Sequence, residues 1–193
     1  MPRVAAALLA VLLCQSALCS ADAQDAKDLS SPGSFMLARG RAGPFRLDMP
    51  VEQVYDLVGR DRIRLAASFR GAEFLPALEI QLAGFTAGPA LTAAIREWPC
   101  GFALWTIWVH DPRFRAANGL GVGSTLGDVK RFYRDAKVTG IDTDDGAHVV
   151  ISELGLWFEM NPATSFPDST RIASVRVMPQ PRDAQARCTD RRR

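Results

Sequence analysis

The stretch Gly119-Leu-Gly-Val-Gly-Ser-Thr-Leu-Gly-Asp-Val-Lys-Arg-Phe-Tyr133 is a short apolar strand that turns on glycines directly into an amphipathic helix. Ser124 or Thr125 can cap this helix, and with Thr125 as the cap Asp128 takes the capping-box position. The expected buried face of the helix consists of Leu126, Val129, Phe132, Tyr133 and Ala136. The stretch therefore predicts a strand-turn-helix unit whose helix lies across a sheet.

A weaker copy of this unit occurs near the start of the chain, at residues 45–57. Pro50 suits a first helical position and Gly59 the position just past the helix end. The copies align so that apolar residues coincide: Phe45 with Leu120, Leu47 with Val122, Val51 with Leu126, Val54 with Val129 and Leu57 with Phe132. This agreement indicates an internal duplication.

Each predicted helix is followed by a run of predicted strands separated by glycine and proline. The first run covers 62–66, 77–82, 91–95 and 102–110, and the second extends from about 138 through 147–151, 154–160 and 171–177. Helices followed by runs of strands favour an α+β fold with antiparallel sheet. We expect two tandem helix-plus-antiparallel-meander units, 44–114 and 115–179, with the helices on one face of the sheet.

The N-terminal residues 1–23 have the pattern of a cleavable secretory signal peptide. Arg3 precedes the apolar run Val4 to Leu13, which is shorter than the roughly 20 residues that span a bilayer. We therefore expect no stable membrane insertion and a periplasmic or secreted protein, cleaved after Ala23. Residues 24–43 are predicted to be a flexible linker, and 180–193 a basic C-terminal tail.

The predicted compartment bears on the cysteines. Removal of the signal takes away Cys14 and Cys19 and leaves Cys100 and Cys188. A pair of cysteines in an oxidising compartment predicts one disulfide bond, and two free thiols are the alternative.

No motif predicts a catalytic residue, a metal site or a cofactor. The glycine cluster lacks the third glycine of a dinucleotide fingerprint and the glycine-lysine pair of a P-loop. Asp142 to Gly146 has the wrong register for a calcium loop and is better explained as an acidic hairpin turn, and His110 and His148 lack ligand-spaced partners. The net charge of +2 also gives no indication of a nucleic-acid partner.

Strand alternation gives the main functional prediction. In 102–110 it places Ala103, Trp105, Ile107 and Val109 toward the helices and leaves Trp108 on the opposite face. The last strands add Trp157, Glu159, Ser174 and Arg176 to that face, with His148 and Val150 beside them. We interpret Trp108, Trp157, Arg176, His148 and Glu159 as a partner-binding face, because tryptophan and arginine often anchor interfaces. Cover of the tryptophans by the linker, the other unit or the tail is the alternative.

The sequence resembles bacterial exported proteins of unassigned function in which an Ile-x-Val strand and an Asp-Pro-Arg-Phe loop precede a glycine-rich turn. Here these residues are Ile107-Trp-Val109, Asp111-Pro-Arg-Phe114 and Gly119 to Leu126. More distantly, the duplicated unit is similar to the tandem repeat of β-lactamase-inhibitory protein and to small outer-membrane assembly lipoproteins. Leu13 and Leu18, which precede Cys14 and Cys19, depart from a lipidation pattern.

Together these features predict an exported, non-enzymatic module that binds or inhibits an envelope or secreted protein. An envelope hydrolase with a dispersed active site and a small-ligand carrier are the alternatives. The sequence does not indicate an oligomeric state or a particular partner.

Overall fold

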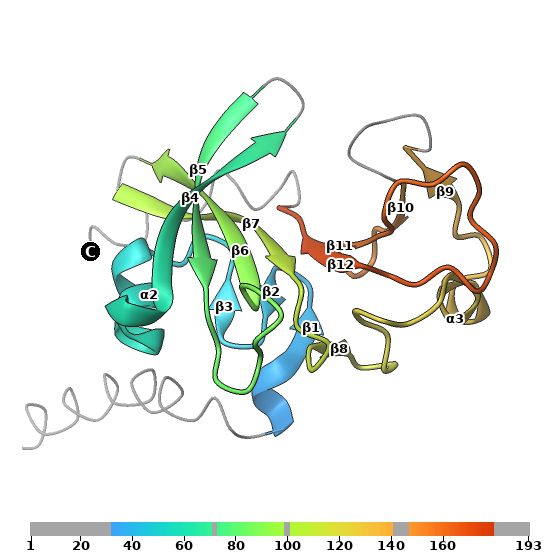
Figure 1. Ribbon diagram of the computed structural model, residues 1–193, viewed down its shortest axis with the longest axis horizontal. Coiled ribbons are helices and arrows are strands. Elements are labelled where there is room, and N and C mark those ends of the chain that lie inside the picture. Colours follow the sequence, from blue (N-terminus) through green and yellow to red (C-terminus); the bar gives the residue numbers. More distant parts are fainter. Residues whose placement is uncertain (1–31, 71–72, 99–100, 141–146, 180–193) are drawn as a thin grey trace, which may run out of the picture.

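A computed structural model describes residues 32–70, 73–98, 101–140 and 147–179. Within these ranges the chain is α+β and mostly sheet, as the sequence predicts, with two α-helices and strands in two sheets (Figure 1). The helices are α2 (Val51–Val58) and α3 (Leu126–Phe132), and short 3-10 turns form η1 (Pro32–Phe35) and η2 (Arg60–Arg62). The predicted signal peptide, Cys100, Cys188, the acidic turn 142–146 and the tail 180–193 lie outside the described residues.

The larger sheet has eight strands in the order β4-β5-β6-β7-β12-β11-β10-β9, and every neighbouring pair is antiparallel. Its strands are β4 (Ile63–Arg70), β5 (Glu73–Ile80), β6 (Leu91–Trp98), β7 (Gly101–Val109), β9 (Val138–Thr139), β10 (His148–Ile151), β11 (Leu156–Glu159) and β12 (Ser174–Val177). The first four and the last four strands each follow one another along the chain. They meet where the last strand, β12, lies against β7.

This meeting of β7 and β12 is short. It consists of three residue pairs, in which Val109, Trp108 and Ile107 face Val175, Arg176 and Val177. In Figure 1, β4 to β7 and α2 lie on one side of this contact, while β9, β10 and α3 lie on the other. The two halves of the sheet are therefore continuous through a narrow contact.

A second sheet has four short strands in the order β3-β2-β1-β8. They are β1 (Met36–Ala38), β2 (Arg41–Ala42), β3 (Phe45–Arg46) and β8 (Arg115–Ala116), and β1 pairs with β8 in parallel. Residues 32–43 are thus part of the fold, and their assignment to a flexible linker was wrong. Leu37 and Ala42 are buried in the core, and Gly40 turns between β1 and β2 with a positive φ of 71°.

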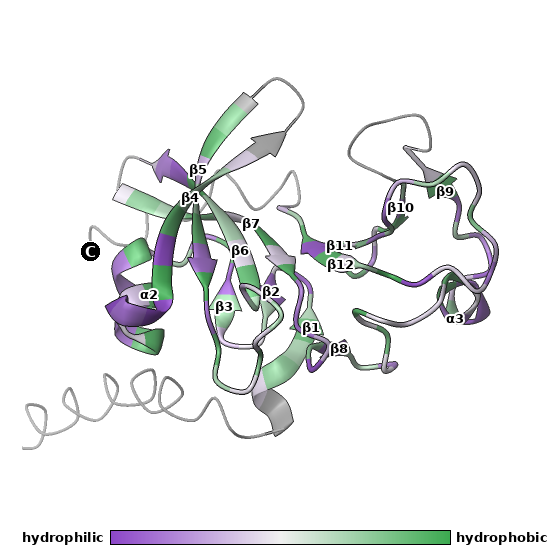
Figure 2. Ribbon diagram, in the orientation of Figure 1, coloured by the Kyte–Doolittle hydropathy of each residue, from purple (hydrophilic) through white to green (hydrophobic). Residues whose placement is uncertain are grey.

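The apolar sides of both helices share one core with the residues on one face of the larger sheet, here called the inner face. Val51, Val54 and Val58 recur at helical spacing along α2, so they form one apolar stripe, which alternates with polar positions in Figure 2. With Leu126 and Val129 of α3 they join a core whose sheet residues include Leu78, Ile80, Leu91, Ala93, Ile107, Val109, Val149, Leu156, Phe158, Val175 and Val177. None of the described helices is long and apolar enough to cross a membrane.

The start of α3 agrees with the capping prediction. The Thr125 hydroxyl accepts a hydrogen bond from the Asp128 N–H at 3.1 Å, and the Asp128 carboxylate accepts one from the Thr125 N–H at 2.9 Å. The bond from the Thr125 N–H, together with one that the Thr125 hydroxyl donates to the same carboxylate at 2.8 Å, lowers the pKa of Asp128. The predicted burial of Phe132 was wrong: this side chain is 53% exposed, because α3 ends there after two turns.

Backbone carbonyls of the same chain accept hydrogen bonds from the N-terminus of α3. The N–H of Leu126 donates to the carbonyl of Thr170, and that of Gly127 to the carbonyl of Asp168, each at 2.8 Å. These are N–H groups that a helix start otherwise offers to an anion. The glycine turn therefore positions the helix against residues 168–172. This agrees with a structural role for the glycines.

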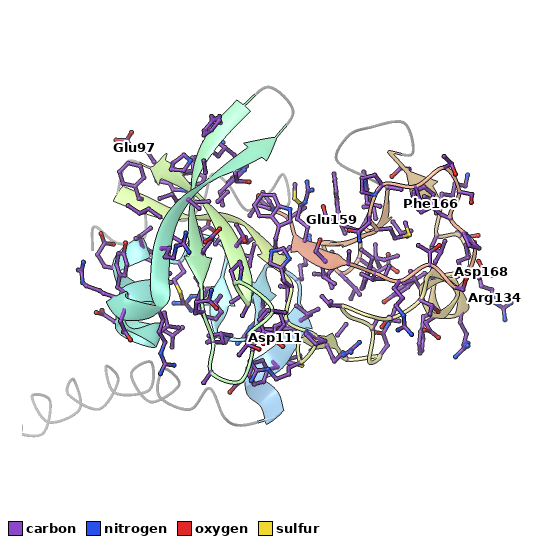
Figure 3. The ribbon with its side chains drawn as sticks, viewed as in Figure 1. Glu97, Asp111, Arg134, Glu159, Phe166 and Asp168 are labelled. Carbon is purple, nitrogen blue, oxygen red and sulfur yellow. The ribbon has the colours of Figure 1, made fainter. Side chains whose placement is uncertain are left out.

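The Asp-Pro-Arg-Phe loop is also structural. The Asp111 carboxylate is buried, and the Arg113 guanidinium donates to it through Nε at 2.9 Å and through a second nitrogen at 2.5 Å. Arg113 also donates to the Ala83 carbonyl at 2.7 Å and lies over the Phe35 ring, 4.5 Å from its centroid. This fork, marked by Asp111 in Figure 3, ties three separate segments together.

Gly121 and Gly123 should respond differently to alanine. A Cβ at Gly121 would lie 2.3 Å from the Phe114 carbonyl oxygen. A Cβ at Gly123 would meet nothing within 4 Å, so the only cost there is the positive φ of 84°, which residues other than glycine rarely adopt. We expect Gly121→Ala to lower the free energy of unfolding by about 2–4 kcal/mol and Gly123→Ala by about 1 kcal/mol. Urea denaturation of both variants measures this, and equal losses would contradict the close-approach explanation.

Candidate functional face

The face of the larger sheet opposite the helices, here called the open face, carries one row of residues across seven strands. The strand register places these residues side by side in the order Arg64, Glu79, Thr92, Trp108, Arg176, Trp157 and Val150. Trp108, Arg176 and Trp157 occupy the middle of the row, where β7 meets β12. The narrow contact between the two halves of the sheet is therefore bridged on this face by aromatic and cationic side chains.

Arg176 lies between the two tryptophan rings. Its guanidinium carbon is 5.0 Å from the centroid of Trp108 and 5.3 Å from that of Trp157. On the far side of Trp157, the His148 ring stacks with a centroid distance of 4.5 Å and an interplanar angle of 6°. We call these four residues the aromatic ladder. Cation–π attraction between the guanidinium and both tryptophan rings stabilises the middle of the ladder.

Glu159 neutralises the charge at the centre of the ladder. It forms an ion pair with Arg176, and the two side chains are only 12% and 16% exposed. The Ser174 hydroxyl donates a further hydrogen bond to the Glu159 carboxylate at 2.5 Å. Glu159 is labelled in Figure 3, beside the point where β12 approaches β7. The ladder thus has a neutral, largely desolvated centre, although Nε of Arg176 is buried without a hydrogen-bond partner among the described residues.

All five residues predicted for the partner-binding face therefore lie in one cluster. Trp108 comes from β7, and the other three ladder residues and Glu159 come from β10, β11 and β12, which follow β7 much later in the chain. Strand alternation was sufficient to find them because β10, β11 and β12 pair without a register shift. The geometry places these residues together; whether they bind a partner remains a proposal.

A second tryptophan cluster on this face was missed. The rings of Trp98 and Trp105 are 5.9 Å apart, and the Arg96 guanidinium lies 5.0 Å from the Trp105 centroid. Arg96 and Trp98 are an even number of positions away from Thr92 along β6, so all three lie on the same face. Trp105 contacts Arg96 and Trp98 and therefore shares this face. All four tryptophans of the chain thus lie on the open face, each half-buried.

The prediction that Trp105 faces the helices was wrong because of a β-bulge. The register between β6 and β7 shifts at Ala94/Ile95: Ala94 faces Thr106, but Ile95 faces Leu104. Trp105 is the extra residue, and Leu104 takes its place in the core at 0% exposed. Residues 102–109 are apolar on both faces of the strand, apart from Thr106. No polar residue in the sequence therefore indicates where the alternation reverses.

The arginines of the open face differ in their partners. Arg64 approaches Glu79 at 3.8 Å, and Arg176 pairs with Glu159. Arg96 is exposed and has no carboxylate partner among the described residues. The Trp98–Trp105 cluster therefore adds an exposed positive charge beside the neutral ladder.

Both histidines of the chain lie on or beside this face, and both have lowered pKa values. Burial lowers the pKa of His110, opposed by the charge of Glu79, and its Nε2 is 3.2 Å from the Thr92 hydroxyl. Burial and then the charge of Arg176 lower the pKa of His148. Among the described residues, no group of three His, Cys, Asp or Glu side chains is placed to hold a metal.

Comparisons with known proteins add a fold relationship. No protein-family model matches the chain, and no curated protein matches its sequence. Among solved structures, the chain is similar to the uncharacterized protein yfeY from Escherichia coli, with a TM-score of 0.51 and 12% identity. The match covers 74% of this chain and 99% of the other. At this identity the similarity concerns the fold alone.

The lowered histidine pKa values predict a pH-dependent stability. Protonation is less favourable in the folded chain, so stability is full above the ordinary histidine pKa, near 6.5, and falls as pH drops through the lower folded values. We expect the free energy of unfolding, measured in urea, to decrease from pH 8 to pH 5. The double variant His110→Gln/His148→Gln should show a clearly flatter profile, and an unchanged slope would contradict this assignment.

Proposed function

We propose that the chain is an exported protein-binding or inhibitory module that acts in the cell envelope and engages its partner through the open face. The observation that carries this proposal is the placement of all four tryptophans on the sheet face that the helices leave uncovered. Tryptophan and arginine are the residues most often found at the energetic centre of protein interfaces. Export rests on the N-terminal signal pattern.

The electrostatics of the aromatic ladder suit an interface centre. Covering a charge costs free energy unless the charge is already paired. Arg176 and Glu159 are already paired and mostly shielded from water, so these two side chains lose little hydration when a partner covers them. The exposed Arg96 lies nearer the periphery, where a polar rim is usual.

We also propose that the fold consists of two tandem units, each a helix followed by a four-stranded meander. The strand order supports this, because α2 precedes β4 to β7, α3 precedes β9 to β12, and the last strands of the two runs lie side by side. This arrangement is compatible with the resemblance to β-lactamase-inhibitory protein and the outer-membrane assembly lipoproteins, which stays a prediction. It also places the aromatic ladder at the junction of the units.

The cluster gives less support to the hydrolase alternative. A general acid or base needs a titratable group that is free to exchange a proton with substrate. The Glu159 carboxylate is engaged by Arg176 and Ser174, and one face of the His148 ring is covered by Trp157. The polar groups of the ladder are thus directed at one another.

Partner capture tests this function. The mature chain would be used to capture proteins from envelope extract, with variants Trp105→Ala and Trp157→Ala. Phe132→Ala is the matched control, since Phe132 is an exposed aromatic side chain on α3, away from this face. We expect each tryptophan variant to lose at least about tenfold in affinity for the captured protein, as for an interface anchor.

Thermal denaturation and near-ultraviolet circular dichroism would show that the variants are folded. The control should retain wild-type capture. Wild-type capture by both tryptophan variants, as by the control, would contradict a binding role for the open face.

A further inference from the structure

In the part of the chain that the structure describes, strand β4 forms one outer edge of the larger sheet and pairs only with β5. It is eight residues long, and every residue from Ile63 to Arg70 has a partner in β5 with no register shift. The opposite edge of the sheet, β9, has two residues. β4 therefore presents the longer row of backbone N–H and C=O groups that no neighbouring strand uses.

β4 carries the charged Arg64 but lacks other common protections of an edge strand. It contains no proline and no bulge against β5, and among the described residues no further strand pairs with it. Leu65 is 75% exposed, and the Arg64 side chain is 79% exposed. Leu65 shares the side of the sheet occupied by its buried partner Leu78, so an apolar side chain is displayed at an accessible edge.

The edge is also basic. Arg60 and Arg62 of the 3-10 turn η2 lead into Arg64 of β4, and all three are exposed. The opposing charges are Asp61 in the same turn and Glu79, whose carboxylate lies 3.8 Å from Arg64. An exposed ion pair of this length contributes little, so Arg64 can exchange it for a better-aligned carboxylate.

We propose that the β4 edge binds an acidic, extended segment of a partner protein by strand addition. In this mode the backbone hydrogen bonds give affinity, and alternate side chains give specificity. On the added strand, an apolar side chain would face Leu65 and a carboxylate would face Arg64. The β4 edge borders the open face, on which Arg64 lies, but strand addition uses the backbone groups of β4 and does not depend on the function proposed for the aromatic ladder.

Charge favours this occupant over a second copy of the chain. Two β4 edges paired antiparallel over their length, about a two-fold axis at Ala67, would place Arg64 of each copy opposite Arg70 of the other. Like charges on neighbouring strands are destabilising. An acidic strand instead neutralises the edge.

A synthetic peptide tests the proposal: acetyl-Thr-Val-Glu-Val-Glu-Val-Thr-amide, titrated into the mature chain up to millimolar concentration and followed by NMR. We expect amide shifts and slowed hydrogen exchange confined to residues 63–68. A peptide with N-methyl groups on alternate residues cannot complete the ladder and should not bind. A peptide with lysine in place of glutamate should bind at least about tenfold more weakly.

The variant Arg64→Glu provides the charge control, because the position is exposed and the substitution should leave the fold intact. It should reverse the preference between the glutamate and lysine peptides. Equal binding of the N-methylated peptide, shifts at the aromatic ladder in place of β4, or no binding at all would overturn the proposal. Self-association of the free chain through β4, detected by light scattering, would replace the acidic partner with a second copy and also overturn it.

Discussion

The pairing of β7 with β12 is the contact on which the rest of the structure depends. Three residue pairs join two antiparallel meanders into one sheet. On the inner face this contact is apolar, with Ile107 and Val109 against Val177 and Val175, all fully buried. On the open face the central pair is Trp108 and Arg176, and Arg176 in turn contacts Trp157. Both sides of the sheet therefore hold the junction, by different kinds of interaction.

The two sides contribute differently to the fold. The apolar pairs stabilise by burial, which has no directional requirement. The guanidinium of Arg176 has strict requirements: it must meet two ring faces and the Glu159 carboxylate together. A buried ion pair often adds little net stability, because desolvation offsets the attraction. We infer that the ladder specifies the register of the β7–β12 contact and presents a rigid aromatic surface there, more than it raises overall stability.

The sequence predicted those features that depend on local periodicity. The capping box of Thr125 and Asp128, the apolar stripe of α2 and the alternation of β11 and β12 each follow from spacing within one element. For this reason Trp157, Glu159 and Arg176 were placed on the correct face without knowledge of which strands are neighbours. The same reasoning grouped Trp108 with them, because its strand is regular on that side of the bulge.

The features that were missed depend on pairing between distant segments. The bulge that moves Trp105 to the open face is a mismatch between β6 and β7, and it has no signature in either strand alone. Likewise, Leu37 is buried because β1 pairs with β8, almost 80 residues later in the chain, so residues 32–43 appeared to be a linker when considered locally. Phe132 is exposed because α3 stops early. In the first two cases, pairing between distant segments determined the outcome.

A double-mutant cycle on Trp108 and Arg176 tests the central claim, that the guanidinium joins the tryptophans across the β7–β12 contact. Trp108→Leu, Arg176→Met and the double variant would be compared by urea denaturation at neutral pH. If the contact holds as described, the two substitutions are coupled by about 1 kcal/mol, in the range of a shielded cation–π pair. Strict additivity of the two losses would contradict the account.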